Sequence, residues 1–568
     1  MALGALVSRI TGFIRNAMIV AALGTALLSD AYTVANTLPN TIFMLLMGGT
    51  LTSVLVPELV RARHDADGGV ACCDRFLTAC LIVLALATAG VICAAPALIH
   101  AYAPAFTGQQ LDLSVSLARY CLPQLFFYGL FTLLGQILVS RDRFGPMAWT
   151  PVLNNLVAIA VFATFIAVTH RAHAADHISS NSAALLGLGS TLGIAVQALA
   201  LWPSLRRSGH TWRPRFDWRG QGLTRIVRSA GWAGASLTVG QLAFWAITRM
   251  ATGLSQDAAR QHLAAGVGLS AYLSAYQLWI VPHGIVAVSL TTAALPRLTR
   301  SVVQHDRGAF AELVTDLTQS LAAVLVPVAL VMGVMAPQIA ALAYRYGRTT
   351  ADDCMIIAEI LAAFAPGLPA MSAQYAHARA LQALGDNRTP ALLTCVSSVL
   401  NVAGSTVAYM VLPTRWAAVG MAAAHTVACM TGAVVTSRLL SHRAQQPGAP
   451  AADAVPGLRL KNAFGPGHAS TAVHLRTLAA GLPGAAVAGL LSYTVAPRGV
   501  GSPVFLIAVT GAGCLLVGCS LRILASPMHV PQSIGILVHS MQYLVQNARR
   551  LKTLTAPSGK AGFRRDRS

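Results

Sequence analysis

The chain has 568 residues, of which 55% are hydrophobic and 10% are charged, and its mean hydropathy is +0.62. This composition excludes an ordinary soluble domain and is typical of a protein that lies within a membrane. The net charge of +21 would suit a nucleic-acid partner, but the basic residues follow a membrane topology instead. No nucleic-acid partner is therefore predicted.

Apolar runs of about 20 residues, the length that crosses a bilayer, recur along nearly the whole chain. They predict an all-α polytopic membrane protein with about 14 transmembrane helices. The predicted spans are residues 9–28, 31–57, 77–101, 115–139, 147–170, 183–204, 229–250, 270–296, 317–343, 355–382, 390–412, 416–438, 477–496 and 503–525.

Lysine and arginine residues collect in every second loop. With the N-terminus placed inside, the even-numbered loops and the C-terminal tail hold 30 of the 40 basic residues. Cytoplasmic loops of membrane proteins are enriched in this way, so both termini are predicted to be cytoplasmic. The positive charge also predicts attraction to anionic membrane lipids. The ten cysteines show no disulfide or metal-binding spacing, and no metal site is predicted.

An internal repeat relates the two halves of the chain. Residues 51–59 (LTSVLVPEL) resemble 290–298 (LTTAALPRL), and residues 142–146 (DRFGP) resemble 386–390 (DNRTP). Both pairs are about 240 residues apart, which predicts a repeat unit of six helices. Two parallel six-helix lobes are a transporter architecture. The alternative is that proline and basic residues merely collect at helix ends.

Two six-helix lobes followed by two C-terminal helices define the predicted domain organisation. A polar stretch rich in proline and glycine separates helix 12 from helices 13 and 14 and predicts a flexible cytoplasmic linker. The predicted boundaries are 1–228 for the N-terminal lobe and its cytoplasmic loop, 229–440 for the C-terminal lobe, 441–475 for the linker, 476–526 for helices 13 and 14, and 527–568 for a basic cytoplasmic tail.

Arg9 and Arg15 are the most informative polar residues, because they interrupt the first apolar stretch. A cation at the bilayer centre costs roughly 2.5–3.5 kcal/mol on insertion scales, so such residues usually meet an anion. Their spacing places them about 9 Å apart along a helix and about 120° apart around it, where both can face one broad cavity. Arg379 in helix 10 is a further candidate. Snorkelling to the cytoplasmic interface is the alternative for each of them.

Other polar residues and helix breakers mark a predicted cavity and gate. Asp30, at the outer end of the first hairpin, is expected either to pair with a cation when the outer side closes or to be a solvated turn residue. The second helix is expected to be interrupted at Leu38-Pro39-Asn40 and at Gly48-Gly49, since proline and glycine are tolerated at membrane depth where a cavity or a neighbour satisfies the backbone. His283 is interpreted as a core residue in preference to a proton carrier. The gate candidates are Asp30, Asn40, Gly48, Gly49 and Pro282, and Gln277 is a substrate-binding candidate.

No enzyme constellation is visible. The sequence lacks the zinc-binding His-Glu-x-x-His pattern, a phosphate-binding Gly-x-x-x-x-Gly-Lys loop and a nucleophile elbow. The chain is therefore predicted to be a transporter and not an enzyme. No cofactor is predicted, and the identity of any coupling ion stays open.

Several short motifs follow one another in an informative order. They are Ser8-Arg9 with Gly12-Phe13-x-Arg15, Asp30-Ala31-Tyr32, Leu38-Pro39-Asn40, Val56-Pro57, Pro123 with Gln136, Arg143-Phe144, Pro151-x-x-Asn154-Asn155, and the stretch RALQALGDNRTP at 379–390. Together they resemble the MurJ/MviN family over residues 1–440, and residues 47–53 resemble its actinobacterial branch. Gram-negative members carry further cavity arginines in helices 2 and 8, where this chain has Phe43 and Gln277.

The resemblance implies a fourteen-helix flippase of the multidrug/oligosaccharidyl-lipid/polysaccharide (MOP) exporter superfamily in the bacterial cytoplasmic membrane. Its expected substrate is lipid II, the undecaprenyl-pyrophosphate-linked peptidoglycan precursor, and cell-wall synthesis or division proteins are further expected partners. Arg9 and Arg15 match cavity arginines of the family, and Asp30 matches its hairpin aspartate. Helices 13 and 14 are expected to supply a groove for the lipid tail.

The predicted mechanism is alternating access, in which Arg9 and Arg15 bind the pyrophosphate from the cytoplasmic side. One alternative is a flippase for another undecaprenyl-linked saccharide. A second is a MATE-like drug exporter, which the scarcity of buried carboxylates disfavours. A third is a membrane scaffold that binds lipid II without transporting it, which the polar helix breaks disfavour.

Overall fold

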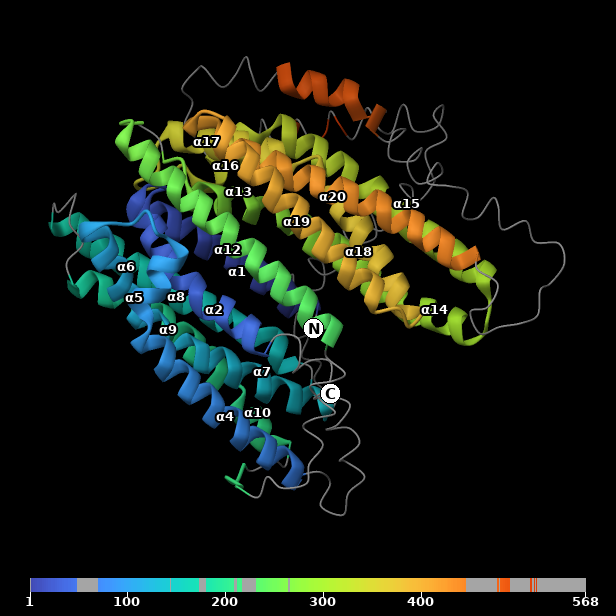
Figure 1. The fold of residues 1–568 in the computed structure, drawn as a ribbon, viewed down its shortest axis with the longest axis horizontal. Helices are drawn as coiled ribbons and strands as arrows, with labels where there is room; N and C mark the ends of the chain where they lie inside the picture. The colour runs from blue at the N-terminus through green and yellow to red at the C-terminus, as the bar shows by residue number, and fades with distance from the viewer. Residues whose placement is uncertain are drawn as a thin grey trace, which may run out of the picture.

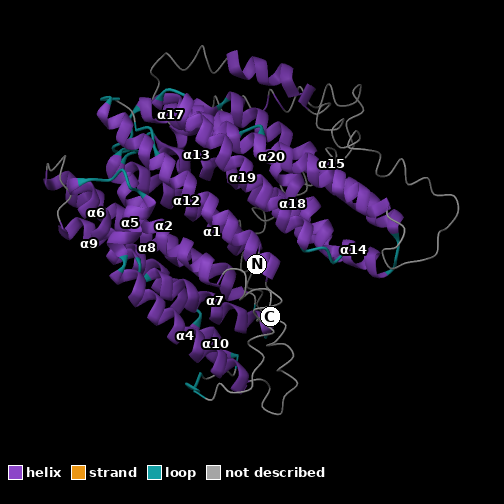
Figure 2. Ribbon diagram, viewed as in Figure 1, coloured by secondary structure: helices purple, strands orange, loops and turns teal. Residues whose placement is uncertain are grey.

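The structure is a computed structural model of the chain. In the part that it describes, the regular structure is helical and no strand occurs (Figure 2), which confirms the predicted all-α class. The described residues are 2–47, 70–141, 143, 145–172, 180–208, 212–216, 231–263, 266–445, 478–479, 481–490, 511–512, 515 and 517.

The helices of the first half pack into one bundle, termed here the N lobe (Figure 1). In this bundle α1 lies against α8, α8 against α9, and α2 against α6 and α7. The bounds are α1 (Ala2–Leu23), α2 (Leu27–Met47), α4 (Val70–Cys93), α5 (Ala95–Tyr102), α6 (Gly108–Cys121), α7 (Gln124–Ser140), α8 (Gly145–Ala172), α9 (Ser180–Leu199) and α10 (Trp202–Arg207).

The helices of the second half form a second bundle, the C lobe. Here α20 lies against α17, α18 and α19, and α15 packs on α14 and α18. The bounds are α12 (Gly231–Arg260), α13 (Leu269–Pro282), the π-helix η2 (His283–Ala287), α14 (Val288–Val303), α15 (Arg307–Val334), α16 (Ala336–Tyr344), α17 (Ala351–Phe364), α18 (Gly367–Ala383), α19 (Arg388–Val411) and α20 (Thr414–Gln445).

Eight described helical segments are long and apolar enough to cross a bilayer, or nine if the bent pair α17 and α18 is one span. α1, α2 and α12 are also long enough, with 22, 21 and 30 residues. These helices follow the order of the first twelve predicted spans, whereas the predicted total of about 14 stays a prediction. Of helices 13 and 14 the structure describes chiefly a short apolar helix, Gly481–Leu490, and the predicted tail lies outside the described residues.

Three expectations about helix limits are wrong. α2 is continuous through Pro39, because this proline is buried among neighbouring helices, where its effect on the backbone is tolerated. α14 continues past Pro296 to Val303. α20 runs on to Gln445, so the predicted linker begins later than residue 441.

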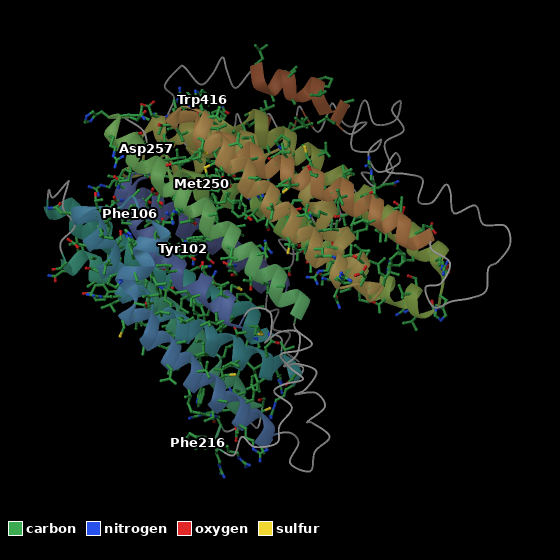
Figure 3. All side chains as sticks on the ribbon, viewed as in Figure 1. Tyr102, Phe106, Phe216, Met250, Asp257 and Trp416 are labelled. Atoms are coloured by element: carbon green, nitrogen blue, oxygen red, sulfur yellow. The ribbon has the colours of Figure 1, made fainter. Side chains whose placement is uncertain are left out.

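The lobes meet at one end and diverge toward the other (Figure 1). At the meeting end a single hydrophobic cluster contains residues of both lobes, among them Tyr102 and Phe106 of the N lobe with Leu254 of α12. Met250 of α12 packs against the same cluster, and Figure 3 shows it with Tyr102 and Phe106 at this end. At the other end each lobe has its own cluster, around Leu134 in the N lobe and around Leu381 in the C lobe.

Two helices of the C lobe are broken at positions that proline explains. Pro282 ends α13, and the chain continues as the π-helix η2 before α14 begins. α17 and α18 meet at an angle of 46° next to Pro366, which cannot donate a backbone hydrogen bond. The hydroxyl of Thr426 on α20 donates to the carbonyl of Ala363 at 2.7 Å and so satisfies a group that the break leaves open.

Candidate functional site

The orientation of α1 is fixed by an asparagine of α8. The side-chain nitrogen of Asn155 donates to the carbonyl of Ser8 at 3.0 Å and to the hydroxyl of Thr11 at 3.0 Å. The neighbouring Asn154 lies instead against Gly193 of α9. The predicted Asn154-Asn155 motif therefore joins three helices and holds the turn of α1 that carries Arg9.

Arg9 reaches across to the C lobe. A Cβ atom on Gly284 in the π-helix would lie 2.9 Å from Cζ of Arg9 and nearer still to its Nη1, so the guanidinium rests directly on this glycine. Arg9 is close enough to His283 to interact with it electrostatically. Its side chain is exposed, so it remains accessible from the space between the lobes.

His283 is held by α18. The hydroxyl of Ser372 donates to the carbonyl of Leu368 at 2.8 Å and must therefore act as the acceptor in its 2.9 Å contact with Nδ1 of His283. This contact places the proton of the neutral imidazole on Nδ1. The ring also meets Tyr375 edge to face, with centroids 5.4 Å apart. The interpretation of His283 as a buried core residue agrees with these contacts, although it borders the site.

Arg379 also contacts Tyr375. Its Cζ is 5.2 Å from the centre of that ring, its Nη2 donates to the Tyr375 hydroxyl at 3.3 Å, and its Nη1 donates to Gln382 at 3.1 Å. Arg9, η2, Tyr375 and Arg379 thus form a continuous surface, termed the cation surface. Tyr375 was missed at the sequence level, although its position four residues before Arg379 is the spacing of helical neighbours.

Arg15 points elsewhere. Its Nε is buried without a hydrogen-bond partner among the described residues, and it interacts electrostatically with Tyr32 and Tyr128 inside the N lobe. Phe43 is buried in the same lobe and stacks on Tyr128, with ring centroids 6.1 Å apart. The structure therefore does not bring Arg15 into contact with Arg9, and its part in substrate binding stays a prediction.

Gln277, Pro282 and Asn40 are not among the residues that define the cation surface. Gln277 is exposed on α13, and Pro282 immediately precedes η2. Asn40 is half-buried in α2. Gly48 and Gly49 lie outside the described residues. No group of three metal-ligating side chains occurs in the described part of the chain.

Asp30 binds the start of a helix in the opposite lobe. Its carboxylate is completely buried and accepts hydrogen bonds from the backbone N–H of Ser270 at 2.7 Å and from the hydroxyl of Ser255. Ser270 lies in the first turn of α13, where backbone N–H groups lack helical partners and favour negative charge. The expected cation is therefore replaced by a helix N-terminus, and the expectation of a solvated turn residue is wrong.

A second carboxylate, Asp353, binds the same region and was not predicted. It accepts from the Thr25 hydroxyl at 2.7 Å and from the backbone N–H of Gly266 at 2.8 Å. It also forms a capping box with Thr350 at the start of α17. The pattern Thr350-x-x-Asp353 could have indicated the capping box, but no local signal connects it to Thr25. Asp30 and Asp353 with their partners are termed the latch.

Further hydrogen bonds continue the latch along α1. Asn16 donates to the Tyr344 hydroxyl at 2.9 Å, and this hydroxyl donates to the Ser274 carbonyl at 3.1 Å. Burial raises the pKa of Tyr344, so its hydroxyl keeps the proton that it donates. The backbone N–H of Arg348 donates to the Ala21 carbonyl at 2.9 Å. The lobes are therefore joined at this end by contacts between neutral groups and carboxylates.

The chain shares its fold with a class of solved transporters. A solved structure described as "Lipid II flippase MurJ, inward closed conformation" is similar with a TM-score of 0.69 at 16% identity, over 93% of this chain and 98% of that one. A multidrug resistance MATE family transporter of the MOP superfamily, in an inward-facing conformation, is similar with a TM-score of 0.61 at 16% identity, over 78% of this chain and 96% of that one.

The sequence identifies the family within this class. The family described as "Lipid II flippase MurJ" matches residues 19–507. The "Probable lipid II flippase MurJ" of Rhizobium meliloti is 26% identical over 75% of this chain and 77% of its own length. The "Lipid II flippase MurJ" of Burkholderia cenocepacia is 28% identical over 64% of this chain and 68% of its own. The chain belongs to the lipid II flippase MurJ family, as its motifs predicted.

Proposed function

We propose that this chain moves lipid II from the inner to the outer leaflet of the bacterial cytoplasmic membrane by alternating access of its two lobes. The family match over residues 19–507 carries this proposal. The cation surface supplies a matching chemistry, because a guanidinium forms paired, charge-assisted hydrogen bonds with phosphate oxygens. Arg9 and Arg379 border this surface from opposite lobes.

In the proposed mechanism the pyrophosphate enters between the diverging ends of the lobes. We propose that these ends and both termini are cytoplasmic, because basic residues are enriched in the loops on that side. It binds Arg9, and the lobes then close behind it while the latch opens. With the inside negative, outward movement of about two negative charges is favoured by roughly 4–5 kcal/mol per 100 mV. Membrane potential is therefore the proposed source of direction. We propose no cofactor, and any coupling ion stays open.

Depletion of the protein in its host tests the function directly. Lipid II exposed on the outer leaflet is measured with a periplasmic muramidase-type probe, together with the total lipid II pool. Loss of exposed lipid II with accumulation inside, followed by lysis, is expected. Unchanged exposure in a host without another flippase would contradict the proposal. Pull-down of cell-wall synthesis or division proteins with the intact chain tests the further partners.

Transport of another undecaprenyl-linked saccharide is the second candidate, because a pyrophosphate-binding cation surface suits that substrate equally well. Continued growth on depletion with loss of a surface polysaccharide would favour it. Drug export by a MATE-like mechanism is less well supported. Three of the described aspartates are buried, Asp30, Asp74 and Asp353, and two of them, Asp30 and Asp353, are engaged in the latch. A non-transporting scaffold would leave lipid II exposure unchanged.

A further inference from the structure

Gly284 in the C lobe is in contact with Arg9 of the N lobe, which is a candidate for substrate binding. It is buried in the π-helix of the C lobe, yet the atoms nearest to its missing side chain are Nη1, Cζ and Nη2 of Arg9 in the N lobe. The cation therefore occupies the volume that any other residue at this position would fill with its own side chain.

Several other glycines in the described helices are also closely packed, but the groups that they contact belong to their own lobe. A Cβ on Gly129 would meet Leu84, one on Gly187 would meet Tyr120, and one on Gly189 would meet Val161. Each of these contacts is packing within one lobe. Gly284 instead accommodates the far end of a long, flexible and charged side chain from the other lobe.

We propose that Gly284 is a positioning residue that seats the guanidinium of Arg9 between the lobes, so that the cation is presented to the phosphate of the substrate. The role in transport rests on the proposed function, whereas the seat itself is a property of the protein alone. A side chain at residue 284 displaces the guanidinium from its place on η2 without disturbing the packing of either lobe, because the three atoms nearest to a Cβ at this position all belong to Arg9.

The local backbone explains why the seat lies here. Pro282 ends α13, and the backbone N–H of Val288 then donates to the carbonyl of His283, which is the i→i+5 bond of a π-helix. Such a turn contains one extra residue and occurs frequently at functional sites. Because glycine has no Cβ, the widened turn can approach a neighbouring group closely. His283, anchored to Ser372, fixes the turn from the other side.

The test compares Gly284→Ala in two backgrounds. In the unchanged Arg9 background, loss of the seat should lower lipid II flipping in proteoliposomes by about tenfold or more, which corresponds to one charge-assisted hydrogen bond. Lysine has a single, narrow ammonium group, so in an Arg9→Lys background the same substitution should change flipping by about twofold at most. The control is Gly90→Ala, since a Cβ on this exposed helical glycine meets nothing within 4 Å.

A structure of the Gly284→Ala protein, determined without substrate, tests the seat independently. The guanidinium of Arg9 should move away from η2 while α1 and α13 keep their positions. A shifted or regularised η2 with Arg9 still in place would overturn the proposal, as would full flipping by Gly284→Ala or an equal loss in the unchanged and Arg9→Lys backgrounds. If the seat is lost as expected but the unchanged protein does not flip lipid II, the proposed function fails and the seat stands.

Discussion

The two charged regions of the molecule are built in opposite ways. At the latch, the carboxyl groups of Asp30 and Asp353 are buried and surrounded by N–H and O–H donors. Along the cation surface and in the N lobe, the arginines meet a glycine, aromatic rings and uncharged oxygens, and Nε of Arg15 has no hydrogen-bond partner among the described residues.

The difference shows that the polar groups of the latch are already paired, whereas the arginines can still bind an anion. A carboxylate that accepts several hydrogen bonds is satisfied and holds two elements together. A cation whose neighbours carry no negative charge retains most of its capacity to bind an anion. We infer that the latch stabilises the conformation in which the lobes meet at this end, and that the arginines are available to bind the phosphate. Substitutions in the latch should therefore change mainly the stability of the closed end. Substitutions of the arginines should change mainly transport.

Arg15→Ala should produce the largest effect. It removes a partly buried cation whose Nε has no hydrogen-bond partner in the described part of the chain, so the melting temperature should stay the same or rise. Lipid II flipping should nevertheless fall by about a hundredfold or more, because an anion loses a charged partner at membrane depth. Flipping in proteoliposomes and the melting temperature of the purified protein measure both effects. Arg415→Ala is the control, since Arg415 is an exposed cation paired with Glu359. Normal flipping by Arg15→Ala would remove Arg15 from the mechanism.

Asp30→Ala should have the second-largest effect, because it weakens the latch. It removes the acceptor of the Ser270 N–H and the Ser255 hydroxyl, and loss of a helix cap costs about 0.5–2 kcal/mol. The latch end should then open more often. A cysteine introduced at Val267, which is 1% exposed, should react with a maleimide about fivefold to tenfold faster in a background from which the ten native cysteines have been removed. Asp352→Ala is the control, because this aspartate is exposed beside the latch. Unchanged labelling would show that Asp30 does not hold the lobes together.

Thr25→Val should have a smaller effect at the same end. The shape is conserved, but Asp353 loses one donor while Gly266 and Thr350 remain. A loss of about 1 kcal/mol in the stability of the closed end is expected, or about fivefold faster labelling at residue 267. Thr238→Val is the control, since the hydroxyl of Thr238 donates to the carbonyl of Gly234 in its own helix and to no other group among the described residues. A larger effect than that of Asp30→Ala would reverse the order of importance of the two carboxylates.

The sequence could predict the parts of this molecule that local pattern determines. Apolar length and loop charge predicted the all-helical membrane fold, and the motifs of Arg9 and Asp30 predicted the family. The contacts between lobes could not be predicted in the same way. Thr25 and Asp353 are 328 residues apart, and the seat of Arg9 depends on a π-helix, whose turn differs from an α-helical turn by a single inserted residue. Such positions are set by tertiary packing, which leaves no periodic signal.

Tyr375→Phe should give the smallest effect and separates two contacts of Arg379. The ring is retained, so the cation–π contact persists, and only the 3.3 Å hydrogen bond to the hydroxyl is lost. This bond is long and contributes little, so lipid II binding should weaken by about twofold. Tyr375→Leu also removes the ring and should weaken binding by about fivefold to tenfold, as expected for a partly desolvated cation–π contact. Equal losses in the two variants, measured as the dissociation constant of lipid II, would show that the hydroxyl and not the ring holds Arg379 at the cation surface.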